Sequence, residues 1–469
     1  MKYFLLCMIA FSLGACTSEK KEHYDVVIYN GNTIDLASGA IEKQDVFISN
    51  GAIAKVLPAA SFTSYSATQK INAEGMYLVP GFWDNHVHFR GGDSLIANNK
   101  NFLKLFIANG VTTVRDAGGD LTSAVMAWQE EMDHGELVGP TIFTSGPKID
   151  GPNPTWAGSL EVSNETEIAN ALDSLEQLNV DFVKLYDSRI SGEHYISTIQ
   201  AAEKRGLLTS GHMPFTVTLE ETVDAGIDAI EHLYYIMKGC SPIEKEVTQQ
   251  LIRKEIGFWQ AMPALMESYD AATAKNTFAY LKQKNVFVVP TLHIGATLSY
   301  LDEVDHANDP YLKFMGKGII ATYQGRIDRA LNSSEKARSD KKALDAFFGR
   351  LAKSLSDADV SLLAGSDSGA FNSYTYPGIS LHKEMEAMVN AGITPLKALQ
   401  ASAYNGSRFF NKQKDYGSIA HGKIADLVLL QANPLTDITN TQRIAYVIQG
   451  KRVQDIKKLK ALLESAIVH

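Results

Sequence analysis

Short apolar runs alternate with amphipathic segments through the middle of the chain, between about residues 77 and 405. Each run is rich in β-branched residues, ends in polar residues and precedes a segment with helical periodicity. Runs this apolar are typical of strands that are covered on both faces of a sheet. Eight such runs follow one another, at residues 77–84, 111–116, 140–146, 181–186, 207–212, 228–233, 286–292 and 360–367. This pattern predicts an α/β fold, a TIM (β/α)8 barrel.

Between these runs we expect helices near 121–134 and 165–178, and a helical insertion or lid over about 293–345, which is long for one connection. The two chain ends have a different pattern. Residues 24–57 and the stretch GSIAHGKIADLVLL near the C-terminus alternate with period two and contain Asn-Gly and Ser-Gly turns. We expect them to pair into one small β-sandwich domain, built from 24–76 and 409–469, around a barrel of 77–408.

The N-terminus reads MKYFLLCMIAFSLGAC. Its apolar run is too short to span a bilayer but suits the central part of a secretory signal peptide. The last four residues resemble a bacterial lipoprotein cleavage signal, which predicts a signal peptide over 1–15, lipidation of Cys16 and a tether over 16–23. An ordinary signal peptide with an incidental cysteine is the alternative. The expected location is the periplasmic side or the outer membrane of a Gram-negative bacterium, and Ser18 favours the outer membrane.

The net charge and the cysteine content limit the classes of binding partner that the sequence supports. The net charge of −9 comes without a basic cluster, which argues against a nucleic-acid partner. We expect a small-molecule substrate and a membrane contact through the lipid at Cys16, and a homo-oligomer is compatible with the sequence. Cys240 would be the only cysteine left besides Cys16, and we interpret it as a packed small residue.

Polar residues with titratable side chains lie in or at the ends of several predicted strands. His86 and His88 are two residues apart, so their side chains share one face of the first strand. The other members of this group are Lys184, His212, His232 and Asp367. Since active sites of TIM barrels lie at the C-terminal strand ends, these side chains are expected to meet in one pocket and to bind metal.

Several of these motifs resemble the amidohydrolase superfamily, within it the imidazolonepropionase-like and prolidase-like branch. The motifs are PGFWDNHVH, GVTTVRDAGG, AGIDAIEHL, LLAGSDSG and GKIADLVLL. The resemblance implies a centre of two divalent ions, with Zn²⁺ the best fit to imidazole and oxygen ligands. It places His86, His88 and Asp367 on one ion and His212 and His232 on the other. Lys184 would bridge the two ions as a CO₂-derived carbamate.

The implied reaction is hydrolysis of an amide bond, in a dipeptide or a related acyl-amino compound, by a metal-bridging hydroxide. Asp367 would be the catalytic residue, first as general base and then as general acid. A cyclic-amide hydrolase and a superfamily deaminase are alternatives, although Lys184 argues against a deaminase with a single metal. A catalytically inactive binding lipoprotein is the third reading.

Residues that could contact the substrate are Arg115, Tyr186 and Tyr234. Arg115 could bind a substrate carboxylate or form an internal ion pair with Asp116. Tyr186, Tyr234 and its neighbour Tyr235 could donate to a carbonyl or simply pack. The loop SGPKIDGPNPTW lacks the glycine/histidine-rich pattern of the dipeptidases in this family. His293 and His382 match no ligand position and are interpreted as structural.

Overall fold

The computed structural model describes residues 21–468, which form a mixed α/β fold. The predicted signal peptide, the lipidation site Cys16 and most of the predicted tether lie outside these residues. Within 21–468, no helix combines the length and the apolar composition needed to cross a membrane.

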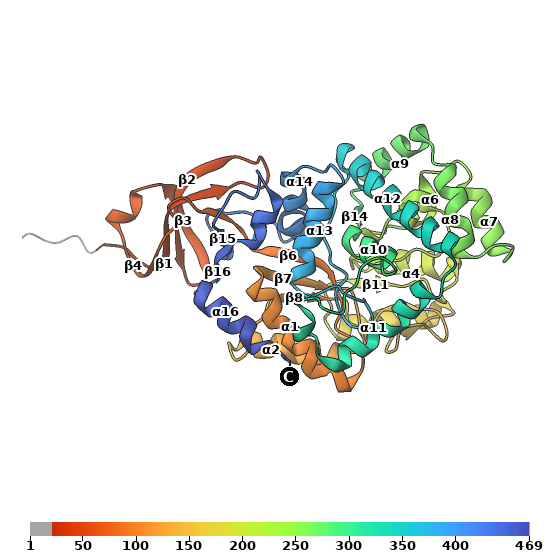
Figure 1. The fold of residues 1–469 in the computed structure, drawn as a ribbon, viewed down its shortest axis with the longest axis horizontal. Helices are drawn as coiled ribbons and strands as arrows, with labels where there is room; N and C mark the ends of the chain where they lie inside the picture. The colour runs from red at the N-terminus through yellow and green to blue at the C-terminus, as the bar shows by residue number, and fades with distance from the viewer. Residues whose placement is uncertain (1–20, 469) are drawn as a thin grey trace, which may run out of the picture.

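The two chain ends form one sheet at one end of the molecule (Figure 1). Its N-terminal strands are β1 (His23–Ile34), β2 (Ile41–Ser49), β3 (Ala52–Pro58), β4 (Ser66–Asn72) and β5 (Tyr77–Pro80), and its C-terminal strands are β15 (Asp426–Leu430), β16 (Ile444–Gln449) and β17 (Arg452–Asp455). The strand order is β17-β16-β15-β5-β1-β2-β3, with β4 also paired to β1. The predicted pairing of the two ends is therefore present, through β5 and β15. The sandwich arrangement stays a prediction.

One predicted boundary differs from the structure. Residues 77–80 were expected to open the barrel, but as β5 they pair antiparallel with β15 and parallel with β1. Leu78 and Val79 are fully buried here, and apolar residues would also be buried in a barrel strand. Composition alone therefore could not distinguish a barrel strand from a strand of the chain-end sheet.

Parallel strands form the middle of the molecule in two sheets. One has the order β6-β7-β8 and the other the order β10-β9-β11-β12-β13-β14. Their bounds are β6 (Phe82–Val87), β7 (Val111–Asp116), β8 (Thr141–Thr144), β9 (Ile149–Asp150), β10 (Leu160–Glu161), β11 (Val183–Leu185), β12 (Thr209–Gly211), β13 (Ala229–Glu231) and β14 (Phe287–Val289). Strands β11 to β14 are three residues long each, and polar residues in them or just after them lead into the loops that carry the candidate site.

The eighth predicted strand is replaced by isolated bridges. Within 360–368, Leu362 pairs with Val288 of β14 and Ser368 pairs with Val87 of β6, both in parallel orientation. Gly365 lets this segment run close to β6, because a Cβ at this position would lie 2.5 Å from the Cβ of His86. The segment thus connects the outer strands of the two parallel sheets.

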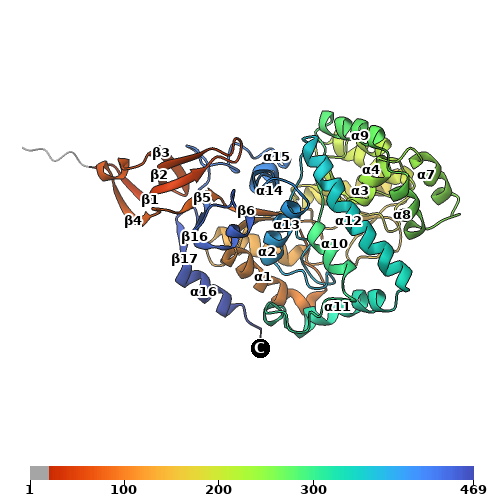
Figure 2. The same cartoon turned by 45° about the horizontal axis from the view of Figure 1, so that its top comes forward.

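Helices cover the outer faces of these strands (Figure 2). Their bounds are α1 (Ile96–Ala108), α2 (Thr122–Asp133), α3 (Glu165–Gln177), α4 (Gly192–Lys204), α5 (Leu219–Asp224), α6 (Tyr234–Gly239), α7 (Glu244–Ile252), α8 (Phe258–Glu267), α9 (Ala271–Gln283), α10 (Leu292–Ser299), α11 (Gly316–Leu331), α12 (Glu335–Asp357), α13 (Ile379–Asn390), α14 (Pro395–Leu399), α15 (Asn405–Phe409) and α16 (Ile456–Ser465). The expected helices near 121–134 and 165–178 are confirmed as α2 and α3. The segment over 293–345 is helical, as α10, α11 and the start of α12.

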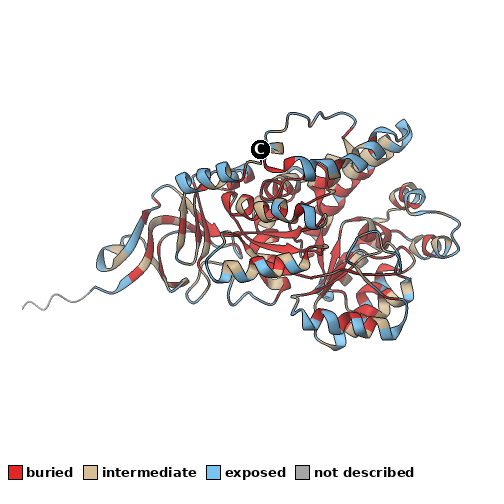
Figure 3. Cartoon of the chain, turned by 90° about the horizontal axis from the view of Figure 1, so that it is seen from below, coloured by how far each residue is buried: buried red, intermediate tan, exposed pale blue. Residues whose placement is uncertain are grey.

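Figure 3 shows that the strands are buried while the helices expose one side. The largest apolar cluster packs the helices onto the parallel strands and includes Phe102, Leu172, Ile199 and Leu351. Cys240 belongs to this cluster and is fully buried, as expected of a packed residue. This core fixes the strand ends from which the candidate site is built.

Candidate functional site

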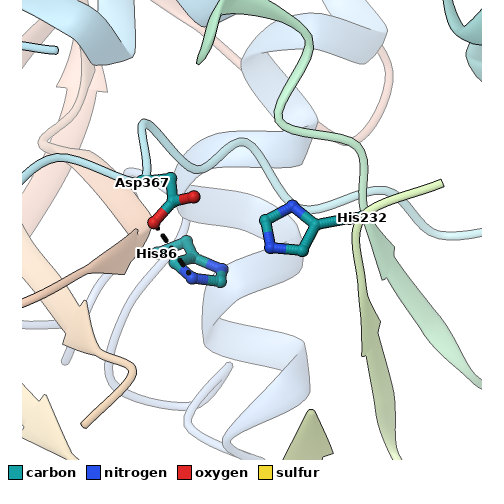
Figure 4. Close-up of side chains that lie close together, drawn as sticks. All are labelled: His86, His232 and Asp367. Carbon is teal, nitrogen blue, oxygen red and sulfur yellow. Dashed lines mark ion pairs between the residues drawn. The ribbon is translucent and has the colours of Figure 1, made fainter. Parts of the chain in front are cut away.

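The predicted ligands come together at the C-terminal ends of the parallel strands. His86 lies in β6 and His88 directly follows it, Lys184 lies in β11, and His212 and His232 follow β12 and β13. Asp367 lies in the segment that bridges to β6. One ligand atom each of His86, His232 and Asp367 can be chosen so that all three lie within 4.8 Å of one another (Figure 4). The convergence predicted from the sequence is therefore present in the structure.

The histidines meet through their Nε2 atoms. The Nε2 atoms of His86 and His88 are 3.2 Å apart, and those of His212 and His232 are 3.1 Å apart. Asp367 Oδ1 lies 3.1 Å from His88 Nε2 and 3.5 Å from His86 Nε2. All these atoms face one small volume.

The opposite ring nitrogens have fixed partners. His88 Nδ1 lies 2.8 Å from the carbonyl oxygen of Gly118, and His86 Nδ1 contacts a carboxylate oxygen of Glu231. Since these acceptors require a proton on Nδ1, the Nε2 atoms carry lone pairs when the rings are neutral. Burial lowers the pKa of both imidazoles, which favours the neutral form. Two lone pairs and a carboxylate that face each other at such distances repel unless a cation lies between them. The donor set fits a metal ion.

Lys184 is fully buried beside this set. Its Nζ lies 3.2 Å from Glu231 Oε1 but has no hydrogen-bond partner within the described residues. Burial lowers the pKa of Lys184 to about 8, against the opposing effect of Glu231. A substantial neutral fraction is therefore present near neutral pH, and the neutral amine is the form that can react with CO₂. The structure therefore has a buried lysine amine next to the candidate ligands, with the Glu231 carboxylate 3.2 Å away.

Glu231 organises the floor of the site and was not among the residues predicted from the sequence. Its carboxylate accepts from Arg115 Nη2 at 2.9 Å and from the Ser210 hydroxyl, and it contacts His86 Nδ1. A signal was available, since Glu231 is a charged residue inside a short apolar strand, as Lys184 is. Such a residue is buried only with partners.

Asp367 is held by its backbone and by one amide. Its φ is 53°, and its N–H donates to the carbonyl of His86 at 2.7 Å. The Nδ2 of Asn372 donates to Asp367 Oδ1 at 2.7 Å. His232 likewise has a positive φ of 67°, and its Nδ1 lies 2.6 Å from the Thr291 hydroxyl. Left-handed backbone at non-glycine residues costs about 1–3 kcal/mol each and clusters at functional sites.

The carboxylate of Asp187 orients the His212 ring. Its Nδ1 lies 3.4 Å from Asp187 Oδ1, and the Tyr235 hydroxyl donates to Asp187 Oδ2 at 2.9 Å. Among the described residues, Tyr235 thus holds the carboxylate that faces His212. The sequence had offered Tyr235 as a donor to substrate.

A cavity of about 190 Å³ opens above the ligands. It is lined by His88, Lys184, His212, His232 and Asp367 together with Tyr186, Tyr234, Trp156 and three basic residues, Arg90, Lys148 and Arg326. Arg90 and Lys148 are 4% and 2% exposed, and burial lowers the pKa of Arg90 to about 10. Arg90 therefore stays charged near neutral pH. Burial and the neighbouring Arg90 lower the pKa of Lys148 well below its usual value, so the guanidinium of Arg90 is the clearest positive charge that faces the cavity.

The predicted substrate contacts separate into two groups. Tyr186 and Tyr234 line the cavity, and burial raises the pKa of both to about 12, so both are neutral donors near neutral pH. Arg115 does not line the cavity. It is fully buried, with Nε donating to the Asn85 carbonyl and Nη1 to the Ser210 hydroxyl. The internal ion-pair reading of Arg115 fits this placement, with Glu231 as the partner in place of Asp116.

The basic lining residues and Asn372 were not predicted from the sequence. Lys148 lies in the loop SGPKIDGPNPTW, whose unusual composition was noted but not read as a site. Arg90 follows the His-Val-His motif by two residues, which was the available signal. Arg326 comes from α11, far from any motif. His382 packs under the site with Nε2 2.8 Å from the Asn109 carbonyl, consistent with a structural role.

Comparison with known proteins identifies the family of the chain. Residues 77–453 match the sequence model described as "Amidohydrolase family". A stretch of 97 residues is 37% identical to an adenine deaminase from Listeria welshimeri, covering 21% of this chain and 15% of that protein. A second adenine deaminase, from Bacillus licheniformis, is matched over 34% of its length, so the chain spans well under two thirds of these relatives.

Two comparisons extend over almost the whole chain. An ochratoxinase from Aspergillus niger is 21% identical over 485 residues, which cover 90% of this chain and 84% of that one. The crystal structure of a Xaa-Pro dipeptidase with bound methionine in its active site superposes with a TM-score of 0.67 at 17% identity, covering 92% of this chain and 99% of that one. The dipeptidase likeness establishes the fold alone.

Proposed function

The chain belongs to the amidohydrolase family, and we propose that it cleaves the amide bond of a dipeptide or a related acyl-amino compound with the help of bound metal. Family membership makes it a hydrolytic enzyme that acts on carbon–nitrogen bonds. The observation that carries the proposal is the convergence of four imidazoles, Asp367 and the buried Lys184 on one cationic cavity. The likeness to an ochratoxinase, which extends over 90% of the chain, supports a small amide substrate.

We further propose two divalent ions, most favourably Zn²⁺. His86, His88 and Asp367 would hold one and His212 and His232 the other, with Lys184 shared between them as a carbamate. Bound ions of this kind lower the pKa of water towards about 7 and polarise a carbonyl oxygen.

The chain's own residues supply the remaining steps. The Asp367 carboxylate accepts a proton from the attacking water and returns it to the leaving nitrogen. Its hydrogen bond from Asn372 fixes one carboxylate oxygen and leaves the other for proton transfer. Tyr234 can donate its phenolic proton to the substrate carbonyl. Arg90 and Lys148 are placed to bind a carboxylate near the cleaved bond.

The deaminase alternative is supported by the adenine deaminase alignments. It predicts ammonia release from a purine base and a centre that does not depend on Lys184. The full burial of Lys184 next to the histidines favours the amide hydrolase.

The test is hydrolysis of a dipeptide and cyclic-amide panel, with adenine included, by protein prepared with Zn²⁺ and bicarbonate. Asp367→Asn should lower kcat by about 10³-fold or more, because it removes a general acid–base group that would also bind metal. Circular dichroism should show an unchanged fold. Asp359→Asn, an exposed aspartate paired with Lys397, is the matched control and should retain wild-type activity. Near-wild-type turnover by Asp367→Asn would contradict the scheme.

We infer that the parallel strands form one closed (β/α)8 barrel. The bridges from 362 to β14 and from 368 to β6 support closure on one side. On the other side, the Asp181 N–H donates to the Thr144 carbonyl at 2.9 Å, between β8 and the start of β11.

We also propose that the protein is exported and anchored through lipid at Cys16. The support is the sequence pattern alone. Labelling with palmitate and recovery in the membrane fraction should both be lost in Cys16→Ala. Membrane recovery that survives this substitution would argue against the anchor.

A further inference from the structure

A second cavity of about 200 Å³ adjoins the candidate site. The two cavities share five lining residues: Tyr234, Gly295, Leu298, Arg326 and Phe348. Gly295 contributes no side chain to this boundary. A Cβ built there would meet only Asp345 Oδ1, at 3.2 Å. Four side chains therefore line the boundary between the two cavities, and at Gly295 no side chain adds to it.

The walls of the second cavity come mainly from α8, α10, α11 and α12, with Tyr234 added from α6. Figure 2 shows α8, α10, α11 and α12 gathered at one end of the molecule, and α10 packs against both α11 and α12. Most of this wall belongs to the long connection after β14. The helical insertion predicted from the sequence thus builds a compartment beside the metal ligands.

The charge of this compartment is strongly positive. Arg326, Arg329 and Lys341 line it, and Asp345 is the one acid among its described lining residues. In residues 21–468, none of the three cations forms an ion pair within 4.0 Å or donates a side-chain hydrogen bond. The next residue on α12 differs, since Lys342 pairs with Asp302 at 2.9 Å.

An aromatic side chain completes the compartment. Trp259 of α8 is 55% exposed, although it is a large apolar residue. Lys341 Nζ lies 5.5 Å from the centroid of its ring. An exposed tryptophan next to unpaired cations is typical of a binding surface more than of a packed core.

We infer that this compartment binds a carboxylate that the substrate carries at a distance from the amide bond being cleaved. The inference rests on the proposed function, because it takes the first cavity as the place of cleavage. Such a carboxylate has two sources: the acyl side of the substrate, or the side chain of an acidic residue on the amine side. In both cases Arg329 and Lys341 provide charge-assisted hydrogen bonds, while Arg90 and Lys148 remain for a group closer to the reaction.

Ligand binding tests the compartment without turnover. Full-length protein is titrated with glutarate and with its uncharged counterpart glutaramide, and tryptophan emission is followed. The titration uses a Trp156→Phe background, because Trp156 lines the first cavity beside Arg90 and Lys148. Glutarate should give a saturable change there that is absent when Trp259→Phe is added and weakened about tenfold when Lys341→Gln is added, since a charged hydrogen bond of this kind is worth about one power of ten in affinity. Glutaramide should give none. Equal responses to both, or an unchanged response in Lys341→Gln, would overturn the inference.

Paired substrates identify the source of the carboxylate. N-glutaryl-alanine against its glutaramoyl counterpart varies the acyl side, and Ala-Glu against Ala-Gln varies the amine side. In one of the two pairs, the acidic substrate should have a kcat/KM about tenfold higher than the neutral one, and the difference should come from a lower KM. Lys341→Gln and Arg329→Gln should reduce that preference below about threefold and leave the neutral member unchanged.

The matched control is Lys342→Gln, which removes the neighbouring lysine on the same helix outside the compartment. It should keep the preference. No preference in either pair, or one that survives both substitutions, overturns the inference. Failure to hydrolyse any of the four compounds counts against the proposed function, whereas the fluorescence titration still decides whether the compartment binds a carboxylate.

Discussion

At the scale of single residues, the floor of the site depends on one buried charge pair. Arg115 and Glu231 are both fully buried, 2.9 Å apart. Removing one partner of such a pair leaves an uncompensated charge in an apolar surrounding. Glu231 also contacts His86 and lies next to Lys184, so Arg115 acts on the site through Glu231.

Arg115→Met should therefore lower the free energy of unfolding by about 3–5 kcal/mol. Urea denaturation of the metal-free protein measures this directly. Arg205→Met is the control, because Arg205 pairs with exposed Asp173 and Glu176 and should cost at most about 1 kcal/mol. A stable Arg115→Met protein with a raised KM for carboxylate substrates would instead support the original reading of Arg115 as a substrate contact.

At the scale of elements, helix α13 positions the loop that holds His232. The carboxylate of Glu384 accepts the backbone N–H groups of Leu292 at 3.0 Å and of His293 at 2.7 Å. These are the first donors of α10, whose N-cap residue Thr291 makes no side-chain cap of its own. Glu384 thus fixes the start of α10, and with it the hydroxyl that contacts His232 Nδ1.

The same helix carries a group that should make stability depend on pH. His382 contacts Thr441 Oγ1 at 2.9 Å and the Asn109 carbonyl at 2.8 Å, so it ties α13 to the chain-end segment and to the loop after α1. Burial lowers the pKa of His382 to about 4. In the unfolded chain His382 binds a proton near pH 6.5, but in the folded chain it does so only near pH 4. Its contribution to the free energy of unfolding is therefore fully present above about pH 6.5 and is lost as the pH falls from about 6.5 to about 4.

Between pH 7.5 and pH 5, His382 should account for a loss of about 2 kcal/mol in the free energy of unfolding. His382→Gln should remove that part of the pH dependence, measured by denaturant titration at both pH values. His134→Gln, which replaces an exposed histidine, should leave it unchanged. A wild-type pH dependence in His382→Gln would mean that other groups cause the loss.

At the scale of the whole molecule, the candidate ligands join strands from positions 86 to 367. An ion held by them binds the folded chain and not the unfolded one, which adds about 4 kcal/mol when its free concentration is a thousand times its Kd. Zn²⁺ added to chelator-treated protein should therefore raise the melting temperature by several degrees, and excess chelator should reverse the rise. Lys184→Ala should show a smaller rise and bind fewer ions, measured by elemental analysis. Equal metal content in both proteins would contradict a bridging role for Lys184.

The sequence alone predicted the alternation of strands and helices in the middle of the chain, the pairing of the two chain ends and the candidate ligand set, because periodicity and strand-end polar residues are local features. It did not show that 77–80 joins the chain-end sheet or that 360–368 forms isolated bridges in place of a strand. It could not determine the partners of buried charges. Arg115 was adjacent to Asp116 in sequence but pairs with Glu231, since only the packing of β7 against its neighbours decides which carboxylate it reaches. The basic lining from Arg90, Lys148 and Arg326 and the compartment beside it likewise depend on loops and helices brought over the strand ends. His86-Val87-His88 was readable as a ligand motif, whereas what faces those ligands across the cavity was decided by the tertiary structure, because contacts between distant segments leave no periodic trace in the chain.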